Sequence, residues 1–287
     1  MLTQQQALQR LKADIKLRGM SESTFNAYLS HVSSFLNYCN RPIDELTELD
    51  VRKFLGHLIT QKKLAPSSVN LYSSAIRFFF AVTLNRAMNY LQIPRVKVPK
   101  KLPQILTREE ISKMVSNCTN LKHKALLLLA YGSGLRASEL VSLRVKDIDS
   151  KTMRVFVCGG KGNKDRYTIL SQSALIALRN YWRRYRPDRE GYLFPAVRTS
   201  GHLTPSAFSL ALYDAVINAG ITKNVSPHTL RHCFATHLLE NGYTIFQIKE
   251  LLGHSSLQST VIYLHMANTT SGVVSPVDII FEGQQPW

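Results

Sequence analysis

The residues of this chain that could perform chemistry gather between positions 226 and 263. The stretch reads SPHTLRHCFATHLLENGYTIFQIKELLGHSSLQSTVIY, which is rich in histidine and also carries an arginine and tyrosines. Ser226 followed by a proline favours the start of a helix, and Gly242 favours its end. His228 and Arg231 are three residues apart within that helix, so their side chains point from the same face.

A second predicted helix delivers two more reactive groups. Thr244 with Gln247 is typical of a capped helix start, and the apolar run that follows breaks at Gly253. This break places His254 directly after the helix, and a further short helix carries Tyr263. The stretch therefore presents imidazole, guanidinium and phenol groups from three consecutive elements.

A metal site is the first chemistry to weigh, because histidines four residues apart on a helix can chelate zinc. His228, His232 and His237 share the first predicted helix. We predict no metal site, because the glutamate of an HExxH motif is absent, Arg231 would lie inside the cluster and no acidic ligand is nearby. A two-metal nuclease is disfavoured for a related reason, since it requires clustered carboxylates.

A phosphodiester is the second candidate ligand. Arg136, at the start of the run LRASELVSLRVKDI, and Arg231 could each offer a planar fork of donors to its non-bridging oxygens. His228 and His254 could add hydrogen bonds or shuttle protons. The phenol of Tyr263 could attack phosphorus, provided that nearby cations lower its pKa from about 10 or that a base removes its proton. The product would be a covalent phosphotyrosine, formed without a divalent metal.

Each of these residues also has an ordinary structural explanation. Arg136 can be a surface arginine or the partner of Glu139 three residues on, and His228 can belong to a helix start. His254 can be a capping residue in a loop, and Tyr263 can be an ordinary residue of an amphipathic helix. The combination of residues favours the phosphate site, whereas any single residue would not.

Composition agrees with a polyanionic partner. The chain has 287 residues, with Lys plus Arg at 36 and Asp plus Glu at 19, which gives a formal charge of +17. This excess suits nucleic acid, although a solvated basic surface would also explain it, and an anionic membrane is a weaker alternative. The four cysteines are scattered without a CxxC pair, so we expect no disulfide framework and a reduced, cytoplasmic setting. No stretch has the length of a membrane span or the pattern of a secretion signal.

The length of the chain predicts two domains. The residue patterns predict that both are mainly α-helical, with a small β-sheet or hairpin in the second. Residues 1–93 carry amphipathic helical patterns and form a small helical domain. Residues 94–106 contain several prolines and basic residues, which predicts a cationic linker. Residues 107–287 form the second domain and a C-terminal tail.

A β-hairpin with a basic tip is predicted in the second domain. Met153–Cys158 and Tyr167–Leu170 are rich in β-formers, and the turn between them reads GGKGNKDR. We expect Lys161, Lys164 and Arg166 to project from this loop toward a groove or phosphate of nucleic acid. A plain hairpin with solubilising lysines is the alternative.

Five segments together resemble the tyrosine recombinases, the phage-integrase-type proteins, of the Xer-like size class. They are GLRASEL, GGKGNKDR, PHTLRHCFATHLL, LLGHSS and TVIYLH, which occur in the order of that family. The resemblance spans nearly the whole chain. It implies a helical core-binding domain and a catalytic domain that close around duplex DNA as a clamp.

The resemblance also implies a role for each matching residue. Arg136 and Arg231 would clamp the scissile phosphate with help from two histidines, and Lys161 would protonate the leaving 5′ oxygen. Tyr263 would form a 3′-phosphotyrosyl link, and no cofactor would be needed because one phosphodiester is exchanged for another. The implied catalytic set is Arg136, Lys161, His228, Arg231, His254 and Tyr263.

The partners that the resemblance implies are a double-stranded DNA recombination site, further copies of this chain in a homotetramer on two paired sites, and a second recombinase or accessory protein. No membrane partner is expected. Lys164 and Arg166 would contact DNA near the hairpin. The second and fourth helices of the first domain would read the major groove through polar residues, namely Ser30, His31, Ser73 and Arg77.

The tail departs from the family pattern. The sequence MANTTSGVVSPVDIIFEG contains helix-breaking residues, so we expect a short apolar plug in place of an exchanged helix, formed by Val277, Ile279, Ile280 and Phe281. Two other functions share much of the pattern. A type IB-like topoisomerase would return the strand to its original partner, and a non-catalytic DNA-binding accessory protein would keep the fold without the reaction.

Overall fold

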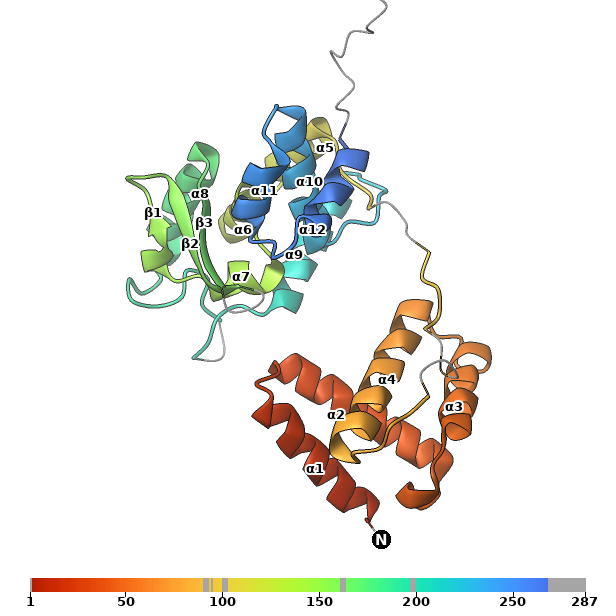
Figure 1. Cartoon of the computed structure of the whole chain (residues 1–287). Coiled ribbons are helices and arrows are strands. Elements are labelled where there is room, and N and C mark those ends of the chain that lie inside the picture. Colours follow the sequence, from red (N-terminus) through yellow and green to blue (C-terminus); the bar gives the residue numbers. More distant parts are fainter. Residues whose placement is uncertain are drawn as a thin grey trace, which may run out of the picture. The chain divides into compact units, whose positions relative to one another are not determined.

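The computed structural model describes residues 2–89, 93, 95–99, 103–160, 164–196 and 200–267. The chain divides into two compact units, residues 1–100 and residues 101–287 (Figure 1). The predicted apolar plug at 277–281 lies outside the described residues. None of the described helices is long and apolar enough to cross a membrane.

The first unit is a bundle of helices around an aromatic core. Capping residues set most of its helix starts, as Thr3 does with Gln6 and Thr47 does with Asp50. Phe35 of the second helix packs against Phe54. The helices are α1 (Gln4–Leu17), α2 (Glu22–Cys39), α3 (Glu48–Thr60) and α4 (Pro66–Phe78). A short 3-10 helix lies at Ile43–Glu45, and a turn of π-helix follows α4 at Phe79–Thr83.

The polar positions of α2 and α4 are less available than the sequence suggests. Because the two helices pack on each other, Ser73 is only 2% exposed, and its predicted place on a DNA-facing surface is wrong. His31 is half-buried and its ring stacks on a tyrosine of α4. Arg77 donates a hydrogen bond to the carbonyl of Ile93 within the same unit, and its contact with DNA stays a prediction. Ser30 is exposed.

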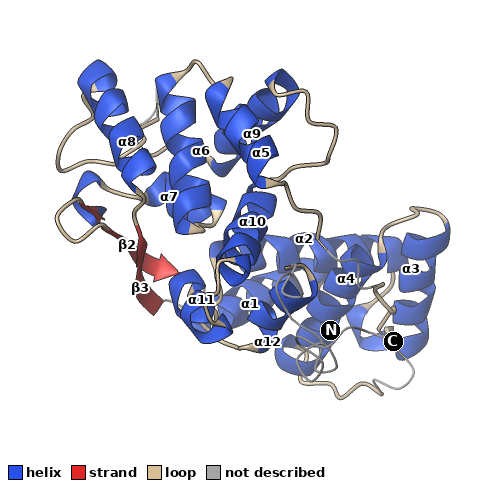
Figure 2. Cartoon of the chain, turned by 90° about the horizontal axis from the view of Figure 1, so that it is seen from above, coloured by secondary structure: helices blue, strands red, loops and turns tan. Residues whose placement is uncertain are grey.

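The second unit packs its helices around α6 (Leu121–Ser133), whose apolar residues are buried on several sides. Figure 2 shows a small sheet at the edge of this otherwise helical unit. The other helices are α5 (Arg108–Ser116), α7 (Ala137–Ser142), α8 (Gln172–Tyr185), α9 (Pro205–Asn218), α10 (Pro227–Glu240), α11 (Ile245–Leu252) and α12 (Gln258–Val261).

The sheet is antiparallel with the order β1-β2-β3. Its strands are β1 (Ile148–Asp149), β2 (Arg154–Gly160) and β3 (Lys164–Ile169). Val155 pairs with Thr168, and the register shifts between Val157 and Gly160, near the hairpin tip. The predicted fold class, mainly α with a small hairpin sheet, is confirmed.

Candidate active site

Four separate elements supply the residues of one pocket in the second unit. Arg136 is the N-cap of α7, and His228 and Arg231 lie on α10. His254 follows the end of α11, and Tyr263 lies in the 3-10 turn Ile262–His265. All five line a cavity of about 240 Å³ together with His232, Gly253, Ser255 and Ser259. The structure thus brings together five of the six predicted catalytic residues, while Lys161 lies outside the described residues.

Arg231 is held in place by backbone carbonyls. Its side chain is 4% exposed, and its guanidinium donates to the carbonyl of Gly134 at 2.8 Å and to that of Leu252 at 2.6 Å. Gly134 ends α6 in the left-handed conformation, and a Cβ there would lie 2.3 Å from a ring carbon of Phe234. Burial, followed by the charge of Arg136, lowers the pKa of Arg231 to about 10, so the side chain is cationic near neutral pH.

A buried carboxylate orients the arginines of the site. Glu139 is 7% exposed. Its oxygens accept from Arg136 at 2.6 Å and from both terminal nitrogens of Arg166 at 2.9 and 2.8 Å, and Arg231 is 3.7 Å away. Burial would raise the pKa of Glu139, but the hydrogen bonds and charges of Arg166 and Arg136 lower it to about 2. An ionised carboxylate among three cations fixes their geometry before any ligand binds.

Arg166 does not project from the hairpin, which corrects the sequence-based prediction. Its side chain is 8% exposed, because Glu139 attracts it inward and the carbonyl of Leu251 accepts from its Nε at 3.0 Å. The residue therefore links β3, α7 and α11. Lys164 belongs to β3 by its backbone, and its contact with DNA stays a prediction.

Replacing Gly253 by alanine tests this packing. Gly253 has a φ of +62°, and a Cβ there would lie 2.6 Å from Cδ of Arg166. Gly220 is a matched control, since its φ is +66° and a Cβ would meet only Lys113 Nζ, at 3.8 Å. We expect Gly220→Ala to cost about 1–2 kcal/mol from the left-handed backbone. Gly253→Ala should cost about 1–3 kcal/mol more, because Arg166 must move. Equal unfolding midpoints in a urea titration would contradict this.

Two histidines of the pocket, His228 and His254, are uncharged near neutral pH. Burial, followed by the charges of Arg231 and Arg136, lowers the pKa of His254 to about 4, and the same causes lower the pKa of His228. His254 Nδ1 lies 2.8 Å from the hydroxyl of Thr260, and this bond orients the ring. Both histidines are therefore suited to hydrogen bonding or proton exchange in preference to charge attraction.

Tyr263 is 2% exposed and packs with the apolar residues of α10 and α11. Burial raises the pKa of its phenol, although the charges of Arg231 and Arg136 act in the opposite direction. The sequence left open two ways to ionise the phenol: nearby cations could lower its pKa, or a base could remove its proton. Desolvation outweighs the cations in this structure, so the second route is favoured.

The histidines of α10 do not converge on a metal. His237 turns away from the pocket, and its Nδ1 lies 2.8 Å from the phenol oxygen of Tyr131. Among the described residues, no group of three or more His, Cys, Asp or Glu side chains could hold a metal ion.

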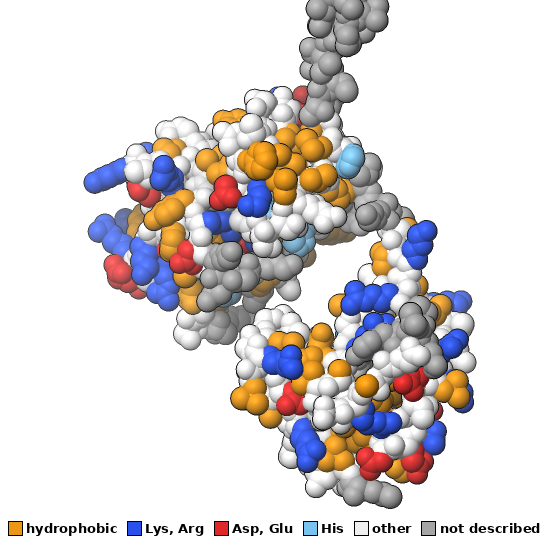
Figure 3. All heavy atoms as spheres, in the orientation of Figure 1, with side chains coloured by type: hydrophobic (Ala, Val, Ile, Leu, Met, Phe, Trp, Pro, Cys, Tyr) orange, Lys and Arg blue, Asp and Glu red, His pale blue; other side chains and the backbone are white. Residues whose placement is uncertain are grey.

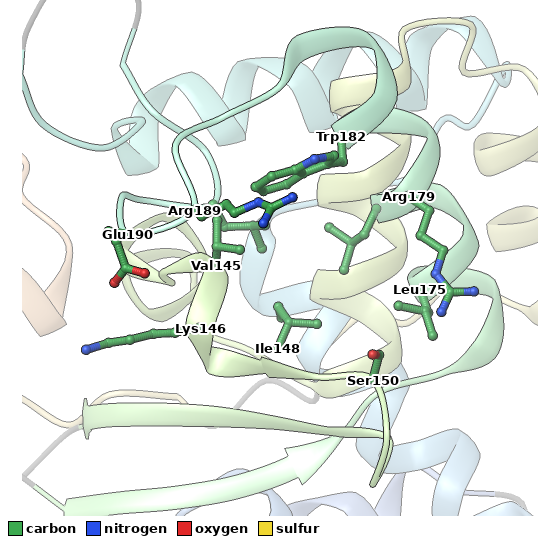
Figure 4. A pocket seen from close by; sticks show the side chains of 11 residues that line it. Val145, Lys146, Ile148, Ser150, Leu175, Arg179, Trp182, Arg189 and Glu190 are labelled. Carbon is green, nitrogen blue, oxygen red and sulfur yellow. The ribbon is translucent and has the colours of Figure 1, made fainter.

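A larger cavity of about 450 Å³ lies elsewhere in the second unit (Figure 4). Its lining is mostly apolar, with Leu175, Leu178 and Leu193, and Trp182 and Arg189 also contribute. Figure 3 shows Lys and Arg side chains gathered on the side of this unit where the sheet and α8 lie. Tyr263, Arg136 and Arg231 are absent from the lining of this cavity, so its size does not make it the candidate active site.

A pocket lined by two arginines, several histidines and a tyrosine defines a class of site that binds an anionic group such as phosphate. Comparisons with known proteins agree. Residues 104–270 match the phage integrase family, and residues 7–90 match the phage integrase N-terminal SAM-like domain. The two matched segments lie one in each structural unit.

The individual relatives are recombinases. The chain is 41% identical to the integrase/recombinase-type protein y4qK of Sinorhizobium fredii, over 95% of this chain and 88% of that protein. It is 37% identical to tyrosine recombinase XerA of Pyrococcus horikoshii, over 89% and 87%. A crystal structure of XerH site-specific recombinase bound to a palindromic difH substrate matches with a TM-score of 0.71 and 21% identity, over 92% and 82%.

The chain belongs to the phage integrase family, and its enzyme class is that of the tyrosine-type site-specific recombinases and integrases. Sequence reasoning did not assign two residues of the pocket region. Glu139 was considered only as a partner of Arg136, and that pairing is confirmed. His232 was considered only as a metal ligand, although its position four residues after His228 on the same helix was a signal that it faces the same pocket.

Proposed function

We propose that this protein cuts and rejoins duplex DNA at specific sites through a 3′-phosphotyrosyl intermediate on Tyr263. The observation that supports this most directly is the shared pocket of Tyr263, Arg136, Arg231, His228 and His254. Two guanidinium groups preset by Glu139 would bind the non-bridging oxygens and stabilise the charge that develops on phosphorus. No divalent metal or nucleotide cofactor takes part in this chemistry.

The remaining roles in this proposal are those that the resemblance to the family implies. Lys161 protonates the 5′ oxygen as it leaves, and His228 and His254 hydrogen-bond to the phosphate. Residues 1–93 act as the core-binding domain, residues 94–106 as the linker and residues 107–287 as the catalytic domain. The active assembly is a homotetramer on two paired sites. The charge of +17 and the DNA substrate in the XerH structure support DNA as the partner.

The test begins by sequencing the DNA next to the gene and searching it for paired inverted repeats. These repeats then serve as the candidate recombination sites. We expect the wild-type protein to form a covalent adduct on a nicked suicide substrate, in which the cleaved strand fragment diffuses away. The adduct should form equally in excess EDTA, because no metal takes part. It should be detected as a protein–DNA band under denaturing conditions.

A second assay with two differently marked sites separates strand exchange from simple relaxation. A recombinase joins the two markers, whereas a type IB-like topoisomerase restores each original strand. The absence of any adduct would indicate a non-catalytic DNA-binding protein and would overturn the proposal.

A further inference from the structure

Tyr263 needs a proton acceptor, and the structure places one beside it. The Nδ1 atom of His232 lies 3.3 Å from the phenol oxygen, and the ring centroids are 5.6 Å apart. We propose that His232 accepts the proton of Tyr263 during attack and returns it when the tyrosine leaves. This inference rests on the proposed function and adds a catalytic residue to it.

The helix geometry explains why His232 reaches the nucleophile. His232 follows His228 by four residues on α10, so the two rings lie on one face, with centroids 6.4 Å apart. Tyr263 comes from the turn that packs on α10. His228 and His232 therefore occupy successive positions along the pocket, and the second of them contacts the phenol.

The other polar groups around the phenol are less suited to accept its proton. The guanidinium of Arg231 lowers the pKa of the phenol, but it is already protonated and has no lone pair to offer. His254 lies parallel to the tyrosine ring at a centroid distance of 6.3 Å. Its Nδ1 is engaged by the hydroxyl of Thr260.

The protonation states suit the transfer. Burial raises the pKa of the Tyr263 phenol, so it keeps its proton near neutral pH. Burial, followed by the charges of His228 and Arg231, lowers the pKa of His232 to about 4. The imidazole is therefore neutral and can present a lone pair at Nδ1. A bound phosphodiester brings a negative charge that raises the pKa of the ring while the proton moves.

The step balances as follows. The phenol oxygen forms a bond to phosphorus while its proton passes to Nδ1 of His232. The bond from phosphorus to the 5′ oxygen breaks, and that oxygen takes a proton from the general acid, Lys161 in our proposal. In rejoining, a 5′ hydroxyl attacks phosphorus and returns its proton to Lys161. The bond from phosphorus to the phenol oxygen breaks, and Tyr263 recovers its proton from His232.

His232→Asn tests the inference, because an asparagine amide can hydrogen-bond to the phenol but cannot hold its proton. We expect single-turnover cleavage of the nicked suicide substrate to slow by roughly 10²–10⁴-fold at pH 7, with DNA affinity unchanged. The rate of the variant should then rise about tenfold per pH unit, since ionisation of the phenol supplies the nucleophile. The wild-type rate should rise less steeply over the same range.

A fluorinated tyrosine at position 263 provides a second readout, because its phenol ionises at lower pH. We expect this replacement to restore much of the rate of His232→Asn. His228→Asn is the matched control on the same helix face, and its rate should not be restored in this way. His232→Gln repeats the test with another uncharged amide if His232→Asn folds poorly.

Cleavage by His232→Asn within threefold of the wild-type rate would overturn the inference. A loss that is equal at every pH and unaffected by the fluorinated tyrosine would overturn it as well, because it would indicate a merely structural role. Failure of the wild-type protein to form any adduct would instead remove the proposed function itself.

Discussion

Tyr263→Phe should abolish the covalent protein–DNA adduct and leave DNA binding intact. The substitution removes the oxygen that attacks phosphorus in the proposed reaction, but it keeps the ring that packs among the apolar residues of α10 and α11. Removing the nucleophile from an enzyme that works by covalent catalysis costs on the order of 10⁶-fold in rate. In this assay, that loss means no detectable adduct. A gel-shift titration on the same duplex should give the wild-type affinity.

Tyr131→Phe is the matched control. It also removes a partly buried phenol that hydrogen-bonds to a histidine of α10, namely His237 at 2.8 Å. Its hydroxyl is not part of the pocket, so this variant should form adduct at a rate close to wild type. An undiminished adduct from Tyr263→Phe would show that another residue is the nucleophile.

The local features of the site were predictable from sequence because their signals act over three or four residues. The cap at Ser226 starts α10 as expected, and Gly253 ends α11 in the left-handed conformation. These two boundaries determine where His228, Arg231 and His254 lie along their elements. The resemblance to the family motifs predicted that distant segments supply one site. Five of the six predicted residues do line one pocket.

The contacts that orient Arg166 were not predictable from local patterns. Arg166 reaches Glu139 across 27 positions of sequence and Leu251 across 85. Nothing in the hairpin turn distinguishes an arginine that folds inward from one that projects to solvent. Its inward position depends on the tertiary placement of a buried carboxylate, which the charge count of the chain does not reveal.

Desolvation explains why the pKa of the Tyr263 phenol differs from what the sequence suggested. From the sequence, cations near Tyr263 were one way to ionise the phenol, since an arginine lowers the pKa of a neighbouring acid. The structure adds burial, which has the larger effect and raises the pKa. Burial of a single side chain depends on how α10, α11 and the following turn pack, so this sign could be assigned only with the fold in hand.

Glu139→Gln should strongly destabilise the second unit. The substitution keeps the shape of the side chain but leaves Arg136, Arg166 and Arg231 without their shared counter-ion. Removing one partner of a buried ion pair costs about 3–5 kcal/mol. For a unit of this size, the melting temperature should fall by roughly 10 °C, which calorimetry would measure. Adduct formation should fall too, because Arg136 loses its orientation.

The difference between wild type and Glu139→Gln should also depend on pH. The folded pKa of Glu139 is lowered to about 2, from an unfolded value of about 4.3. Its stabilisation is therefore complete above the unfolded pKa and is lost as the pH falls toward 2. The melting temperatures of the two proteins should accordingly converge as the solution is acidified from about pH 5.

Glu250→Gln is the control for this variant. Glu250 is 79% exposed and pairs with Lys249 at 3.2 Å, so its loss should change stability by less than about 0.5 kcal/mol. Equal melting temperatures for the two variants at pH 7 would show that Glu139 contributes no more than a surface carboxylate. Arg166 and Arg231 would then be held mainly by backbone carbonyls, namely those of Leu251 for Arg166 and of Gly134 and Leu252 for Arg231.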